Sequence, residues 1–330
     1  MKANISILWT NVSEKTYPTL LSYLMMAAFV ILLSFFPFTK KEADLLIMFY
    51  SLGTLVLALS VLFVGKVDGS VYIGRMTISI LGKNQDPNGL AAILLSGAFY
   101  SLYKVFENKK WLIPYAVAFL IQSVTVFYTG SRGGLVAYFV ALAVFIAVKI
   151  PRKKRLAALL IALAIVIVGA LVLEAVLPDR LFSRLFDFSG YLESSGVGRV
   201  KIWTTALKEL AKSPLIGYGT TSHFRFFSQT LGGELAMHNT FLCVAFETGF
   251  VGLVLFIIPF LTTLINAIKR KNALIVALLV ANIVAAFFLD SLYLRFLWNA
   301  LIFGAVCKNT SDLEAKNDLE GAELVGKCKK

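Results

Sequence analysis

One histidine stands where a polar segment gives way to a long apolar run. His238 opens the stretch HNTFLCVAFETG and is one of two histidines in the chain. An imidazole near its ordinary pKa of about 6.5 accepts a proton from a hydroxyl group at neutral pH. Asn239 and Thr240 can cap the helix that follows, and the first N–H groups of a helix favour an anion. Both properties suit attack of a hydroxyl on a carbon whose leaving group is a phosphate. The alternative is an interfacial histidine bonded to a carbonyl.

Two arginines are candidates for binding that phosphate. Arg132 lies in YTGSRGG, at a turn between two apolar runs, and Arg199 lies one turn before Trp203 on the apolar side of a helical pattern. A guanidinium group offers a planar fork of donors that matches phosphate oxygens and stays charged. The glycines beside Arg132 are expected to let a ligand approach the backbone. The alternative for each arginine is a side chain that reaches lipid headgroups.

Three further residues could contribute to substrate binding. Arg180 and Arg184 lie in LPDRLFSRLFDF and would add positive charge to the same rim, although contact with lipid headgroups is the favoured role for both. Tyr218 lies between Gly217 and Gly219, in a tight turn expected beside the helical bundle.

Glu247 follows His238 by nine residues within the apolar segment. On a continuous helix this spacing places the carboxylate roughly 13 Å deeper and on the opposite face, so a direct contact with His238 is not expected. A carboxylate inside a membrane is costly. Glu247 is therefore predicted to pair with an arginine or to cap broken backbone near Gly249, and so to shape the site. His223 is predicted to be a loop residue without a chemical role.

Two aspartates have structural alternatives. Asp86 precedes Pro87 and is predicted to cap a helix, with a substrate contact as the alternative. Asp290 and Arg295 lie near a predicted turn, where they either pair with each other or face the same cavity. Both options remain open from the sequence.

The composition predicts an all-α protein embedded in a membrane. Hydrophobic residues make up 58% of the 330 residues, charged residues 15%, and the mean hydropathy is +0.79. Soluble domains carry about 25% charged residues, and the excess apolar residues here come in blocks of about 20, the length that crosses a bilayer. We expect one transmembrane bundle over residues 19–307. The predicted spans, about nine, cover residues 19–37, 45–64, 88–106, 111–129, 133–149, 156–177, 239–268, 272–289 and 291–307.

The formal charge of +13 comes largely from short loops between these blocks. Under the positive-inside rule, the basic loops at 40–41, 104–110, 149–155 and 269–271 lie in the cytoplasm. The long loop 178–237 and residues 1–18 are then extracytoplasmic, and the polar tail 308–330 is cytoplasmic. This distribution argues against nucleic-acid binding.

A helix is predicted over residues 198–212, within the long loop. Trp203, Ala206, Leu207 and Leu210 recur at helical spacing, with lysines on the other side. We expect this amphipathic helix to lie on the bilayer surface, with Trp203 at headgroup depth. No cleavable leader is evident in the sequence, and the spacing of the three cysteines suggests neither a disulfide framework nor a metal site.

Four segments carry a resemblance to a known family. DPNGLAAILL, YTGSRGGLVAY, GRVKIWTTALKELAKSPLIGYG and HNTFLCVAFETGFVG, in this order and with a large outer loop, resemble the O-antigen polymerase/O-antigen ligase family of bacterial membrane glycosyltransferases. The resemblance covers roughly residues 80–305. The chain departs from the family in its length, with nine predicted spans rather than ten or more, and in lacking the arginine repeat that some polymerases carry.

The resemblance implies a metal-independent, inverting transfer with no cofactor, on the outer side of the bacterial cytoplasmic membrane. The donor would be a glycan on undecaprenyl diphosphate, and the acceptor a second glycan. Carried over by position, Arg132 and Arg199 would hold the diphosphate, His238 would activate or orient the acceptor hydroxyl, and Glu247 would shape the site. Chain-length regulators and flippases are the proteins with which such an enzyme would work.

Three functions follow in order of preference. The first is a polymerase that joins lipid-linked repeat units into a surface polysaccharide. The second is a ligase that moves finished polymer onto lipid A core, another wall component or a protein. The third is a transporter or flippase, which is less favoured because no internal inverted repeat is visible and the charged candidates gather at one rim.

Overall fold

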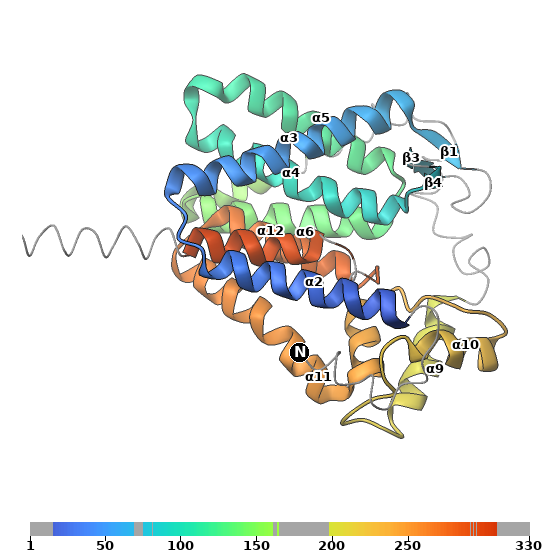
Figure 1. Ribbon diagram of the computed structural model, residues 1–330. Coiled ribbons are helices and arrows are strands. Elements are labelled where there is room, and N and C mark those ends of the chain that lie inside the picture. The colour runs from blue at the N-terminus through green and yellow to red at the C-terminus, as the bar shows by residue number, and fades with distance from the viewer. Residues whose placement is uncertain are drawn as a thin grey trace, which may run out of the picture.

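The computed structural model describes residues 16–68, 75–80, 82–160, 164, 198–290, 292, 294 and 296–308. Within these ranges the protein is an α-helical bundle with two small β hairpins, as expected from the composition (Figure 1). Six of the described helices are long and apolar enough to cross a membrane: α2 (Thr16–Phe35), α3 (Lys40–Val64), α4 (Pro87–Glu107), α5 (Leu112–Tyr128, extended at its start by the 3-10 turn Lys109–Trp111), α6 (Arg132–Lys149) and α11 (Thr240–Lys269).

Two shorter apolar helices, α12 (Ala273–Ala286) and the helix Phe296–Lys308, complete the described bundle. Each described helix of the bundle corresponds to a span predicted from hydropathy, with ends that differ by a few residues. The predicted span 156–177 lies mostly outside the described residues, as do residues 1–15 and 309–330.

The ends of several helices follow from local sequence. Thr39 and Glu42 form a capping box at the start of α3, and Asp86 caps α4 with Pro87 in its first turn, as predicted. Ser131 caps α6 and Asn239 caps α11. These caps satisfy backbone N–H groups that a helix leaves unbonded at its start.

The segment between α3 and α4, where the sequence predicts no membrane span, contains four short strands. β1 (Lys66–Asp68) pairs antiparallel with β2 (Arg75–Thr77), and β3 (Ser79–Ile80) pairs with β4 (Lys83–Asn84). Met76 and Ile78 are buried against Val61 and Leu90, so this segment packs on the ends of α3 and α4.

The two ends of the bundle differ in charge. At one end Lys104 pairs with Asp44, and Lys149 pairs with Glu107. Lys40 and Lys41 share a cavity with Asp44 and Lys104, so the basic loops predicted to lie on one side do gather there. The opposite end carries the β hairpins, α9 (Arg199–Leu210) and α10 (Ser222–Leu231) (Figure 1).

α9 confirms the helix predicted over 198–212. Part of its apolar face packs on protein, whereas Leu207, which belongs to the predicted face, is 53% exposed. Ile202, Ala206 and Leu210 are buried. The first two pack with Phe227 of α10 and Phe246 of α11. Trp203 is half-buried in the same cluster. The helical spacing is the same whether an apolar face packs on lipid or on protein. Here the aromatic residues of α10 and α11 bury Ile202 and Ala206 within the protein.

Candidate functional site

The loop before α11 holds His238 in an unusual backbone conformation. Its φ is +52°, in the left-handed region, where non-glycine residues are uncommon and cost on the order of 1–3 kcal/mol. Such strain persists only where the surroundings impose it, and it gathers at functional sites. Asn239 follows as the cap of α11, and its side chain accepts from the backbone N–H of Leu242 at 3.0 Å.

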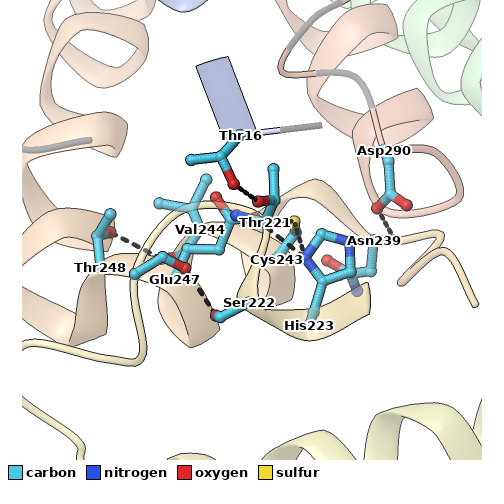
Figure 2. Close-up of polar contacts among 11 residues, drawn as sticks. Thr16, Thr221, Ser222, His223, Asn239, Cys243, Val244, Glu247, Thr248 and Asp290 are labelled. Carbon is cyan, nitrogen blue, oxygen red and sulfur yellow. Dashed lines mark hydrogen bonds and ion pairs between the residues drawn. The ribbon is translucent and has the colours of Figure 1, made fainter. Parts of the chain in front are cut away.

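Contacts with the segment after α12 hold this loop in place. The backbone N–H of Asn239 donates to Oδ1 of Asp290 at 3.3 Å (Figure 2). The hydroxyl of Thr240 donates to the carbonyl of Leu289 at 2.6 Å. The carboxylate of Asp290 therefore lies beside His238, while Arg295 lies outside the described residues.

His238 is surrounded by charges of both signs. Burial lowers the pKa of its imidazole, and the positive charges of Arg199 and Arg75 act in the same direction. The negative charges of Asp290 and Asp86 oppose this lowering. The imidazole therefore remains neutral to a lower pH than an ordinary histidine does, which is the state that accepts a proton. Arg75 is the first residue of β2.

Arg132 is the first residue of α6, at the turn where it was predicted, and one of its guanidinium nitrogens is buried. The preceding Ser131 donates to Oδ1 of Asn88 at 2.8 Å, and Asn88 donates to the carboxylate of Asp86 at 3.1 Å. Asp86 also acts on His238. Arg132 and His238 thus lie at the same end of the bundle, joined through the start of α4.

The glycines after Arg132 have a different purpose from the one expected. A Cβ atom on Gly133 would lie 2.7 Å from the Cβ of Phe288, and one on Gly134 would meet Ala91. These glycines allow neighbouring helices to pack closely, so they do not leave the backbone open to a ligand. Gly130, in contrast, has a φ of +68° and forms the turn itself.

Trp203 connects α9 to the histidine loop. Its indole nitrogen donates to the backbone carbonyl of Met237 at 2.9 Å, and Met237 is fully buried. Arg199 lies one turn earlier on α9 and is half-buried. Packing of α9 on α11 thereby brings the Arg199 guanidinium into electrostatic range of His238.

α11 breaks at Gly249, whose φ is +67° and ψ −177°. Residues 214–219 pack against this break and take up its free backbone groups: Phe250 donates to Pro214, Tyr218 donates to Phe246, and Gly219 donates to Glu247. The hydroxyl of Tyr218 donates to the carbonyl of Glu209 at 2.9 Å, and its ring lies 5.1 Å from that of Phe246. The structure thus places Tyr218 in the contact between α9 and α11.

Glu247 forms the centre of a buried polar cluster. Its Oε1 lies 3.0 Å from Nδ1 of His223 and accepts from the backbone N–H of Thr221 at 2.7 Å (Figure 2). Cys243 lies one turn earlier on α11. Its Sγ is 3.8 Å from Nδ1 of His223 and 3.8 Å from Oε1 of Glu247. The expectation that His223 lies in a loop was wrong: it lies in helix α10, is 4% exposed and pairs with Glu247.

A cavity of about 460 Å³ lies between α2, α10 and α11. It is lined by His223, Cys243 and Glu247 on one side and by Asp290 on another, but not by Arg132, Arg199 or His238. Asp290 is shared between the cavity and the histidine loop, so the two polar groups are neighbours. Arg180 and Arg184 lie outside the described residues and remain predictions.

Part of the chain is similar in sequence to O-antigen ligases. Residues 117–257 match the family model for O-antigen ligase. An O-antigen ligase from Pseudomonas aeruginosa is 30% identical over 174 residues, which make up 52% of this chain and 39% of that protein. The chain therefore spans less than half of the curated relative.

The fold also resembles a solved structure. A chain in the structure described as "Structural coordination of polymerization and crosslinking by a peptidoglycan synthase complex" superimposes with a TM-score of 0.52 over 93% of this chain and 94% of that chain, at 16% identity. At this identity the likeness shows a shared fold. The segment matched by the family model contains Arg132, Arg199 and His238, and the two sequence matches support a relationship to the O-antigen polymerase/O-antigen ligase family.

Proposed function

We propose that this protein is a glycosyltransferase of the O-antigen ligase type, which moves a glycan from a lipid diphosphate carrier to an acceptor hydroxyl. The observation that carries the proposal is the position of His238, held in a left-handed conformation within electrostatic range of Arg199 and Asp290. The comparisons favour ligation over the polymerisation that the sequence analysis ranked first, since both matches are to O-antigen ligases.

In the proposed reaction the acceptor oxygen attacks the anomeric carbon of the donor sugar. The bond from that carbon to the diphosphate oxygen breaks, and the lipid diphosphate leaves with the bonding electrons. The imidazole of His238 takes the proton from the acceptor hydroxyl. Attack from the side opposite the leaving group inverts the anomeric carbon.

Cations at this end of the bundle stabilise the leaving group. Arg199 acts electrostatically on His238, and Arg132 starts α6 at the same end. Negative charge on the diphosphate grows as the sugar–oxygen bond breaks, so fixed guanidinium groups bind the transition state more tightly than the ground state. Arg199 also lowers the pKa of His238 and so keeps the base neutral.

The charge asymmetry of the bundle supports an orientation. Basic residues gather at the end that carries Lys40, Lys104 and Lys149, opposite the histidine loop. Under the positive-inside rule this end is cytoplasmic, which puts the proposed site at the outer face of the bacterial cytoplasmic membrane. A donor whose lipid stays in the bilayer presents its diphosphate at this depth.

Deletion of the gene, followed by analysis of lipid-linked glycans, tests the proposal. If the protein is a ligase, its loss should make long unattached polymer accumulate on the lipid carrier. Accumulation of single repeat units would instead indicate a polymerase. Accumulation of neither would overturn both readings. His238→Asn should behave as the deletion does, because asparagine tolerates the left-handed backbone but is not a base. Lys271→Asn is the matched control, with the same φ of +52° at the opposite end, and should restore attachment.

A further inference from the structure

The cluster at the centre of the cavity wall has the composition of a metal site. We propose that His223, Cys243 and Glu247 bind a divalent transition metal, with zinc as the expected ion. One ligand atom from each residue lies within 4.8 Å of the other two, and the three side chains are buried. The inference goes beyond the proposed transfer and does not depend on it.

The distances between the three atoms approach those of a tetrahedral site. Nδ1 of His223 and Oε1 of Glu247 are 3.0 Å apart, and Sγ of Cys243 lies 3.8 Å from each. Zinc bonds of about 2.0–2.1 Å to nitrogen or oxygen and about 2.3 Å to sulfur require ligand separations of roughly 3.3–3.6 Å. Shifts of a few tenths of an ångström, roughly, would therefore form one face of a tetrahedron.

Two helices fix these ligands before any metal binds. Cys243 and Glu247 are four residues apart on α11 and so point to the same side. His223 comes from the first turn of α10, which packs on that side. The backbone N–H of Thr221 donates to the Glu247 carboxylate, and such an outer hydrogen bond orients a metal ligand.

The types of ligand select the ion. A thiolate, an imidazole and a carboxylate suit zinc or a neighbouring transition metal, whereas Mg²⁺ and Ca²⁺ prefer oxygen ligands alone. Binding would release the thiol proton of Cys243, since the thiolate is the ligand. The ion would then balance the two anionic side chains, which are costly to bury without a cation.

A fourth position would face the cavity. The three ligands line the same cavity of about 460 Å³ as Asp290 and Tyr23, so a water or an oxygen of a bound molecule has access to the ion. Three protein ligands with one exchangeable position distinguish such a site from a closed structural zinc site with four protein ligands. Figure 2 shows the sulfur of Cys243 between His223 and Glu247, with Asp290 nearby.

Metal analysis of the full-length protein, purified in detergent without chelators, tests the proposal. We expect about one zinc per chain. After exchange into Co²⁺, an absorption band from thiolate-to-cobalt charge transfer should appear. Cys243→Ser should abolish the band. The double variant Cys307→Ser/Cys328→Ser is the matched control, because it removes the other two cysteines of the sequence, and should keep it.

A second variant separates a metal site from a simple hydrogen-bonded cluster. His223→Gln keeps a hydrogen-bond donor for Glu247 but removes the imidazole ligand. It should bind zinc at least about tenfold more weakly and lose the rise in Tm that zinc gives the original protein. Folded protein without stoichiometric metal, or a band that survives in Cys243→Ser, would overturn the proposal. Neither readout depends on transferase activity.

Discussion

The indole nitrogen of Trp203 lies 2.9 Å from the backbone carbonyl of Met237, the residue immediately before His238. This bond ties α9 to the loop that holds the proposed base. It also explains how Arg199, on the same helix, comes to act on the imidazole. The helix that the sequence predicts at the membrane surface therefore also supports the site.

Replacement of Trp203 by phenylalanine tests this support. The variant keeps most of the apolar contact but loses the donor, so the free energy of unfolding should fall by about 1 kcal/mol. Transfer activity should fall by more than the loss of folded protein explains, because the His238 loop is no longer fixed. Trp111→Phe is the control at the basic end, where the side chain is 54% exposed, and should leave both quantities unchanged.

The pH dependence of transfer should reflect the charges around His238. The pKa of the imidazole lies below about 6.5, so kcat/KM should stay high below that pH and fall as the pH drops through the lowered pKa. Asp290→Asn removes a charge that favours the imidazolium and should move this acid limb to lower pH. Arg199→Met should move it to higher pH. If the acid limb shifted in the same direction in both variants, or in neither, His238 would be excluded as the base.

A lysine at position 132 should not preserve the transfer activity that Arg132 supports. If the guanidinium binds the diphosphate through two parallel hydrogen bonds, Arg132→Lys should lose nearly as much transfer activity as Arg132→Ala, by about 10-fold or more. Kinetics with a purified lipid-linked donor would measure the loss. Full activity in the lysine variant would show that a positive charge alone suffices.

The break in α11 predicts that alanine substitutions at Gly249 and Gly53 change the free energy of unfolding by very different amounts. In Gly249→Ala a Cβ would collide with the carbonyl of Leu215, and the φ of +67° is strained for alanine, so unfolding should become easier by more than about 1–3 kcal/mol. Gly53 lies inside α3 with nothing within 4 Å of a Cβ, and Gly53→Ala should be neutral or stabilise by up to about 1 kcal/mol. Thermal unfolding in detergent measures both.

Labelling of single cysteines tests the orientation. Ser228 is exposed on α10 and Lys109 is exposed at the basic end. In a chain whose native cysteines are replaced by serine, Ser228→Cys should react with an impermeant thiol reagent added to intact cells. Lys109→Cys should react only after the membrane is opened. The reverse pattern would invert the proposed topology and place the transfer site in the cytoplasm.

The amino-acid sequence by itself determined the helices, their caps and the separation of charge. A membrane helix needs only a continuous apolar stretch, and a cap needs only one polar residue at its start, so both can be read locally. For the same reason the turn at Arg132, the cap at Asn239 and the break at Gly249 lie where the sequence indicated.

Tertiary structure alone decided which polar residues meet. His223 and Glu247 are 24 residues apart, and their contact depends on α10 packing against α11 through Phe227 and Phe246. The apolar face of α9 could equally have met lipid, because helical spacing records a buried face but not what buries it. The packing of aromatic side chains that are distant in the sequence determined both the His223–Glu247 contact and the burial of α9. No local sequence pattern encodes this packing.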